Sequence, residues 1–351
     1  MAKRLRSPDR GDGGKRPRHG RKHLYVVLDD RQNGYSVHKV DADADGVGLA
    51  DPPLLQLESM EDSGGVLVGA LGSKILALWQ PTADGQLTTH AVAYGTDTDK
   101  LAVGPPHPDA LLTMRFVVAA GERLYALHEG GLHCLELVSE SDSDSDETLP
   151  SGADEAEEHR WAWTRVSSPL RLPGCGGDPE EDDEPIEITS YALHPDGRTI
   201  FWTPRGEWLL PFQGQGHYDA GLDAWVGLHS PGYMCACDVP APVTNGHHSG
   251  DAPRQPAWEL VSAASLLYAD PDPKVSDSAA WLVCMGGGQF CVVESMALAE
   301  AEQEDEHLLL RLATLRLERD LHGGLRASSR RTLACRVLKF DPLFSPRAFC
   351  M

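Results

Sequence analysis

The feature that most constrains the fold of this chain is a long series of strand-length apolar runs separated by turn residues. LYVVLD (24–29) and GYSVHKV (34–40) are rich in β-branched and aromatic residues, and a polar turn cluster divides them. GVLVGAL (65–71) and KILALWQ (74–80) repeat the arrangement around Gly72-Ser73. Because the apolar pattern has a period near two, these segments are predicted to form β-hairpins.

The same pattern continues to the end of the chain. Further hairpins are predicted at 114–138, 187–203, 215–239 and 279–295, each with Gly, Asp or Pro at its turn. The segment 295–315 contains good helix formers, but strand and turn signals follow it. We therefore expect an acidic hairpin loop at 297–307 and an all-β protein.

Repeated hairpins are typical of sandwiches, barrels and propellers. Segments of 35 to 60 residues each supply two to four strands here, which is the length of a propeller blade. A sandwich of this length would need a larger single core than domains usually maintain. The prediction is a β-propeller over residues 24–340 with five to seven blades, six being the best fit, closed by pairing of the strand at 24–29 with C-terminal strands. Residues 341–351 are assigned to a C-terminal tail.

Several strings resemble a plant family of unknown function that is greatly expanded in grasses. They are SYALHPDGRTIFWT (190–203), GEWLLPFQGQGHYDAGLDAWVGL (206–228), GYMCACDV (232–239) and CMGGGQFCVVES (284–295). The resemblance covers roughly residues 24–340 and implies a kelch-like β-propeller but no activity. Family members usually have a further strand between Trp202 and the Glu-Trp-Leu-Leu motif, so one blade is expected to be a strand short. The missing strand is also consistent with a marginally stable family member whose sequence has drifted by mutation.

The charge of the chain is unevenly distributed. Residues 1–23 hold nine Lys and Arg against two Asp, a net of +7, so the total of −22 leaves −29 for the remainder. The arm has little apolar surface to bury and is predicted to be disordered. Its two basic clusters have the spacing of a bipartite nuclear import signal recognised by an import carrier: Lys3, Arg4, Lys15, Arg16 and Arg18. The alternative is a solvated basic tail that carries no localisation signal. Nucleic acid is disfavoured as a partner, because the negatively charged remainder of the chain would repel it.

Two acidic inserts interrupt the predicted propeller. Residues 139–158 contain nine acidic side chains and residues 177–187 contain seven, so both are predicted to be disordered loops. Ser139, Ser141 and Ser143 each precede an Asp by three positions, the pattern that acidophilic serine kinases prefer. These serines are candidate phosphorylation sites, the alternative being a solubilising loop without modification.

Composition also limits the compartment. No apolar run approaches the roughly 18 residues of a membrane helix, and no apolar stretch follows the basic N-terminus as in a secretory signal. Eight cysteines in 351 residues are too few for a disulfide scaffold, so an intracellular protein with reduced thiols is expected. We expect a nuclear location, with the cytoplasm as a second compartment.

The residues that could carry chemistry are each better explained by structure. A structural zinc site usually has two closely spaced pairs of ligands, and this chain has one such pair, Cys235 and Cys237. His217 and His229 are nearby in sequence but do not form a second close pair, so no metal or cofactor is expected. His194, Asp219 and Asp223 fall in turn motifs, as do the glycines at 286–288, and His247-His248 lies in a polar loop. Core packing is expected for Trp79, Trp202, Trp208, Trp225 and Trp281, and partial exposure for Trp161 and Trp163.

These observations predict a non-enzymatic platform for protein partners. A propeller enzyme with an unrecognised channel site and a substrate adaptor for ubiquitin ligation are the alternatives. The 23-residue arm is too short and too polar for an F-box, which weighs against the adaptor. Converging carboxylates, histidines or metal ligands in a central channel would favour the enzyme.

Overall fold

The fold was examined in a computed structural model of the chain. It describes residues 23–30, 34–41, 49, 52–57, 63–81, 91–104, 108, 116–128, 131–139, 159–166, 188–197, 199–204, 210–229, 233–240, 255–261, 275–298, 307–338 and 346–351. The basic arm up to residue 22 and the acidic insert at 177–187 lie outside these ranges, as do residues 140–158 of the other insert.

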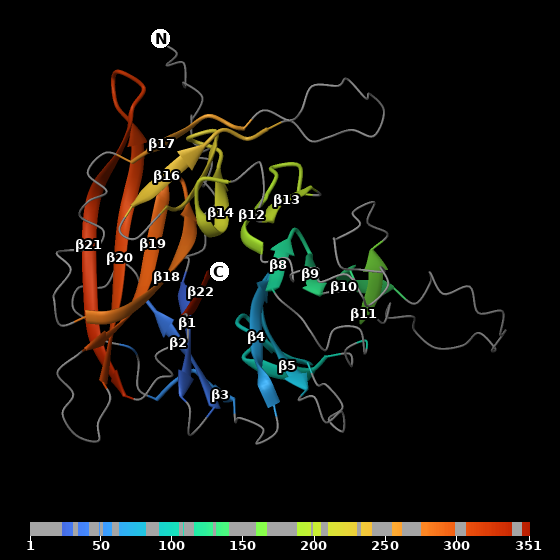
Figure 1. The fold of residues 1–351 in the computed structure, drawn as a ribbon. Helices are drawn as coiled ribbons and strands as arrows, with labels where there is room; N and C mark the ends of the chain where they lie inside the picture. Colours follow the sequence, from blue (N-terminus) through green and yellow to red (C-terminus); the bar gives the residue numbers. More distant parts are fainter. Residues whose placement is uncertain are drawn as a thin grey trace, which may run out of the picture.

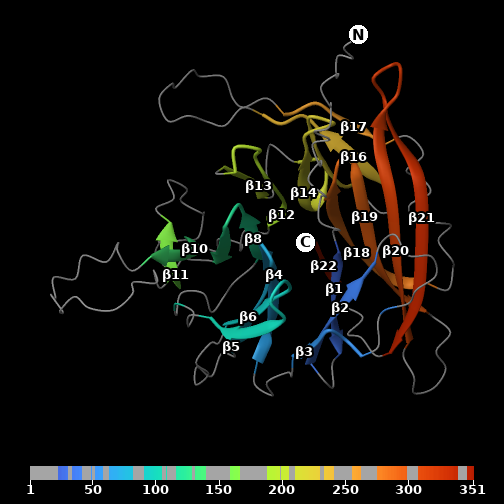
Figure 2. The same cartoon turned by 180° about the vertical axis from the view of Figure 1, so that it is seen from behind.

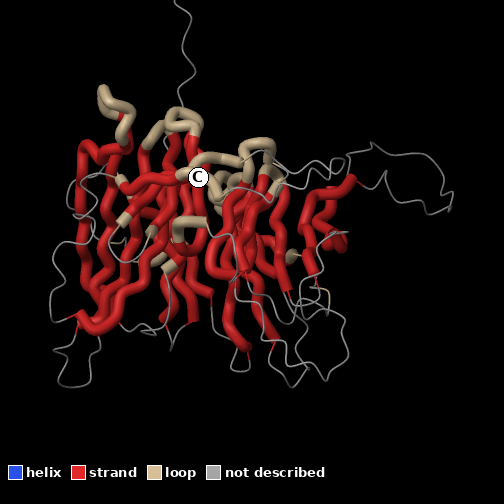
Figure 3. The backbone as a smooth tube through the Cα atoms, turned by 45° about the horizontal axis from the view of Figure 1, so that its top comes forward, coloured by secondary structure: helices blue, strands red, loops and turns tan. Residues whose placement is uncertain are grey.

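The described residues form β-strands, turns and loops, without a helix, as Figure 3 shows. Four sheets have four strands each. Blade 1 is β22 (Arg347–Cys350), β1 (Leu24–Asp30), β2 (Gly34–Val40) and β3 (Leu55–Leu57). Blade 2 is β4 (Ser63–Leu71), β5 (Lys74–Pro81), β6 (Ala91–Gly95) and β7 (Lys100–Val103). Blade 3 is β8 (Phe116–Ala120), β9 (Arg123–His128), β10 (Gly131–Ser139) and β11 (His159–Val166).

Blade 4 is a six-stranded sheet and blade 5 completes the ring (Figure 1). Blade 4 runs in the order β13 (Ile200–Pro204), β12 (Ile188–Leu193), β14 (Gln213–Asp219), β15 (Ala224–Leu228), β16 (Met234–Cys237) and β17 (Trp258–Leu260). Blade 5 is β18 (Val275–Gly286), β19 (Gln289–Leu298), β20 (His307–Arg319) and β21 (Leu325–Leu338). Within each blade, neighbouring strands are antiparallel, except that β12 and β14 are parallel.

The all-β prediction is confirmed, and five blades fall within the predicted range of five to seven. The preferred number of six is not found, because the hairpin of β12 and β13 joins the next blade instead of forming its own. Three residue pairs, from Ser190↔Gly214 to Ala192↔Gly216, make this parallel connection. The predicted hairpin around the acidic loop is also confirmed, since Ala297 on β19 pairs with Leu308 on β20.

The N- and C-terminal ends of the described chain close the ring within blade 1. β1 pairs with β22 from Leu24↔Cys350 to Val27↔Arg347, and two backbone hydrogen bonds continue the ladder between His23 and Met351. Closure by the N-terminal strand is thus confirmed. The assignment of residues 341–351 to a tail is wrong for residues 347–350, because a run of only four residues, RAFC, is too short to stand out as a strand in the sequence.

Hydrophobic clusters join four of the five pairs of neighbouring blades. They are centred on Tyr25 and Ile75, Leu78 and Leu124, Val226 and Phe290, and Val26 and Val293. Among the described residues, no such cluster joins blade 3 to blade 4. At that junction the core is internal to blade 4, where Phe201 of β13 packs edge-on against Trp225 with ring centroids 5.2 Å apart.

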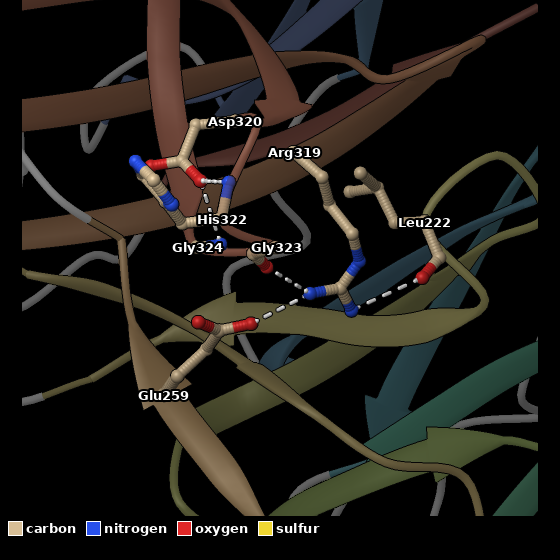
Figure 4. Close-up of polar contacts among 7 residues, drawn as sticks. All are labelled: Leu222, Glu259, Arg319, Asp320, His322, Gly323 and Gly324. Atoms are coloured by element: carbon tan, nitrogen blue, oxygen red, sulfur yellow. Dashed lines mark hydrogen bonds and ion pairs between the residues drawn. The ribbon is translucent and has the colours of Figure 1, made fainter.

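On the side away from blade 3, polar contacts connect blade 4 to blade 5 (Figure 4). The Arg319 guanidinium donates to Glu259 on β17 at 2.9 Å and to the Leu222 carbonyl at 3.3 Å. The adjoining turn is fixed by Asp320, whose Oδ1 accepts hydrogen bonds from the backbone N–H groups of His322 and Gly324. One guanidinium therefore ties β17 and the β14–β15 turn of blade 4 to the β20–β21 turn of blade 5.

Candidate functional site

The innermost strands of all five blades surround a central cavity. In Figure 2 the labels of β22, β4, β8, β14 and β18 encircle the C-terminus. The cavity has a volume of about 210 Å³ and its wall is mostly apolar. The apolar lining residues include Leu67, Val68, Val117, Ala119, Val283 and Phe349. None of the described lining residues is acidic, so the converging carboxylates that would favour an enzyme do not occur in the described part of this wall.

Among the described residues, Arg347 is the only charged side chain in the cavity lining. Its guanidinium carbon lies 4.2 Å from the centroid of the Trp281 ring, a cation–π contact between blades 1 and 5. The indole is held in place because its Nε1–H donates to the Ala348 carbonyl at 3.1 Å. Among the described residues no carboxylate pairs with Arg347, and burial lowers the pKa of its guanidinium.

Two polar side chains of β14 also reach the cavity. Gln215 and His217 are two positions apart on a strand, and both line the cavity. His217 Nε2 lies 2.9 Å from the Leu282 carbonyl, which can only accept, so this nitrogen carries the proton. Burial lowers the pKa of His217 to about 4, and the imidazole is therefore neutral at pH 7 with Nδ1 as an acceptor.

The predicted turn roles are confirmed by hydrogen bonds. Gly197 N–H donates to the His194 carbonyl at 2.9 Å, as expected for a turn. Asp219 Oδ1 accepts from Gly221 and Leu222 N–H groups, and Asp223 has a positive φ of 50°. The glycines at 286–288 all have positive φ in the β18–β19 turn.

Four of the seven described cysteines are buried thiols, Cys235 and Cys237 among them. Cys235 and Cys237 lie two positions apart on β16, with their side chains in one core cluster as their spacing predicts. Burial raises the pKa of each to about 12, so both are protonated at neutral pH. The two histidines near them in sequence lie in different places. His217 lines the cavity, whereas the ring centroid of His229 is 5.1 Å from that of Trp258. Within the described ranges, no three or more His, Cys, Asp or Glu side chains are grouped as metal ligands would be.

Other sequence candidates fall largely outside the described residues. These are Lys3, Arg4, Lys15, Arg16, Arg18, Ser141, Ser143, Trp208 and His247-His248. Ser139 is the last residue of β10, opposite His159 on β11, so its backbone is paired in a sheet. No helix suited to crossing a bilayer occurs in the described part of the chain.

The sequence pattern does not reveal the residues that give the cavity its character. Trp79 and Trp225 are buried as predicted, but Trp281 lines the cavity beside Arg347. Arg347 falls in the predicted tail, and no sequence pattern singles out Trp258. Only the alternation of Gln215 and His217 on one strand could have indicated a shared face.

The closed ring of five blades around an open cavity defines this protein as a β-propeller. The chain belongs to the family described as "Protein of unknown function (DUF1668)", whose model matches residues 21–201 and 202–336. The expected family of unknown function is thereby confirmed at this level. No curated protein sequence matches the chain.

Two solved structures resemble the fold at low sequence identity. A putative 6-phosphogluconolactonase from Bacteroides fragilis is 9% identical, with a TM-score of 0.42, covering 92% of this chain and 100% of that one. A putative 6-phosphogluconolactonase from Bacteroides uniformis is 10% identical, with a TM-score of 0.41, covering 90% of this chain and 99% of that one. Likeness at this level carries no inference about the activity of this chain.

Proposed function

We propose that this protein is a non-enzymatic, nuclear platform that binds a protein partner on one face of blade 4. The observation that carries the proposal is a row of apolar side chains, just before β16 and on β17, that no described part of a neighbouring blade covers. Tyr233, Trp258 and Leu260 keep 41%, 43% and 45% of their surface exposed.

The strand pairing places these three side chains on one face. Trp258 and Leu260 pair with Cys237 and Cys235, and directly paired residues point to the same side of a sheet. Tyr233 is two residues before Cys235 and so shares that side. We call this surface the open face of blade 4, defined by Tyr233, Trp258 and Leu260.

The open face lies on the side of blade 4 where only the β12–β13 hairpin, and not a full blade, separates it from blade 3. The β12–β13 hairpin covers the inner part of this side of the sheet, where Trp225 is fully buried and its Nε1–H donates to the Leu193 carbonyl at 2.9 Å. A two-stranded hairpin cannot extend over the outer strands as a four-stranded blade would. The missing cover accounts for both the exposed row and the lack of a shared core between blades 3 and 4 among the described residues.

The chemistry of the open face indicates the kind of partner. Within the described part of the chain, β17 is the outermost strand of its sheet. A strand of a partner protein can therefore pair with its outer backbone edge. Burying a Trp and a Leu from water stabilises a complex by roughly 25 cal/mol per Å² of apolar area. The charge of −29 outside the basic arm favours a basic partner. The proposed ligand is therefore an extended protein segment with alternating apolar side chains and flanking Lys or Arg.

The test compares two pairs of exposed apolar residues on outer strands. The variant Trp258→Ser/Leu260→Ser disrupts the open face, and Leu101→Ser/Val103→Ser on β7 is the matched control, since those residues are 57% and 79% exposed. Proteins from nuclear extract that bind the wild type and the control, but not the first variant, would be purified and titrated. We expect the first variant to weaken binding by about tenfold or more. Equal binding by all three proteins would overturn the proposal.

The nuclear location is tested separately with the basic arm. Residues 1–23 fused to a fluorescent reporter too large to diffuse through nuclear pores should concentrate it in the nucleus. Substituting Lys15, Arg16 and Arg18 by Ala should abolish the concentration. An even distribution of the unsubstituted fusion would remove the arm as an import signal.

A further inference from the structure

The central cavity contains a cation, Arg347, that no carboxylate among the described residues neutralises. Ion pairs elsewhere in the described ranges, such as Arg311 with Glu294, satisfy buried guanidinium groups with carboxylates. Arg347 has instead the flat face of Trp281 on one side and the cavity on the other. Arg347 is half-buried, and withdrawing part of a charge from water without a counter-ion is unfavourable, so a bound anion would lower that cost.

We propose that the central cavity binds a small organic carboxylate, with Arg347 as the residue that recognises the carboxylate group. This site is separate from the open face of blade 4 and does not depend on the proposed protein partner. The guanidinium is planar and presents parallel N–H donors, the geometry that a carboxylate matches with two hydrogen bonds. Stacking on Trp281 holds that plane in position before the ligand arrives.

The charge of the site favours a monoanion. Arg347 supplies one positive charge, and His217 is neutral at pH 7, so the lining offers a total of one. A phosphate monoester with nearly two negative charges would leave about one charge uncompensated among apolar side chains. A carboxylate has one negative charge and leaves none.

The size and wall of the cavity limit the rest of the ligand. A volume of about 210 Å³ corresponds to roughly seven water molecules at about 30 Å³ each, which suits a ligand of about ten non-hydrogen atoms or fewer. Val117, Ala119 and Val283 provide an apolar wall for a hydrocarbon or aromatic body. Gln215 and the Nδ1 acceptor of His217 can bind a hydroxyl or amide N–H on that body.

The test uses benzoate as the carboxylate, benzamide as its neutral analogue and phenyl phosphate as the dianion. Binding to the full-length protein is measured by titration calorimetry and by quenching of tryptophan fluorescence. Benzoate should bind about tenfold or more tightly than either analogue. Arg347→Met should remove this preference, and Arg319→Met, which alters an arginine outside the cavity lining, should keep it.

Each alternative outcome has a defined meaning. Equal binding of benzoate and benzamide, or no saturable binding of benzoate, would overturn the proposal with the wild-type protein alone, even if Arg347→Met fails to fold. Stronger binding of phenyl phosphate than of benzoate would overturn the assignment to carboxylates. Unchanged benzoate affinity in a folded Arg347→Met variant would exclude Arg347 as the recognising residue.

Discussion

The carboxylate of Asp219 accepts a hydrogen bond from the backbone N–H of Gly288 at 2.7 Å, although the two residues belong to different blades. The same side chain closes its own turn through Gly221 and Leu222 and is only 3% exposed. Asp219 is therefore both a turn residue and a link between blades 4 and 5.

Replacing Asp219 should destabilise the propeller. Asp219→Ala leaves buried N–H groups in two blades without an acceptor, and we expect the free energy of unfolding to fall by about 3 kcal/mol. Asp219→Asn keeps one acceptor oxygen and should have a smaller effect. Urea denaturation measures both variants. Asp223→Asn is the control, because Asn also tolerates the positive φ of 50° at this position and Asp223 accepts an exposed hydrogen bond from Tyr218. An equal loss there would contradict the linking role.

His217 should make stability depend on pH. Its pKa is about 4 in the folded protein, because burial disfavours the charged imidazolium, and near the ordinary histidine value of 6.5 in the unfolded chain. The unfolded chain thus binds the additional proton, and stability contributed by neutral His217 is lost as pH falls from about 6.5 towards 4.

The size of this effect can be measured by substitution. From about pH 7.5 to about pH 5, the wild type should lose about 2 kcal/mol more unfolding free energy than His217→Gln, which cannot be protonated. Arg347 also lines the cavity, and its guanidinium stays protonated throughout this range. Parallel pH profiles for the two proteins would show that folding does not lower the pKa of His217.

Deleting residues 346–351 should open the ring. The deletion removes β22 and leaves one edge of β1 unpaired, although Leu24, Val26 and Val27 are fully buried in the intact protein. An exposed apolar edge promotes association between chains. We expect loss of cooperative unfolding and the appearance of oligomers, measured by calorimetry and by light scattering after size exclusion. Deleting residues 1–22 is the control, and a monomeric, cooperatively unfolding product of the C-terminal deletion would contradict the closing role of β22.

Local hairpins were predictable because neighbouring residues encode them. Val27 and Val37, separated by a polar turn, occur as a directly paired couple on β1 and β2. The turn at His194–Gly197 and the role of Asp219 were readable for the same reason, since turn chemistry depends on a few consecutive side chains. The number of blades is harder to predict from the sequence, because it depends on the pairing of β12 with β14. Residues 205–212 separate these two strands, and no local pattern in that segment indicates that they belong to one sheet.

The sequence by itself determined the period-two pattern, the hairpin turns and the opposite charges of the arm and the remainder. Only the tertiary structure decided that Trp281 and Arg347, from two blades, meet in a central cavity, and that Trp258 and Leu260 stay uncovered. The physical reason is the range of the interactions: alternation and turn geometry act within a few residues, whereas a cavity and an uncovered face arise from packing between whole blades.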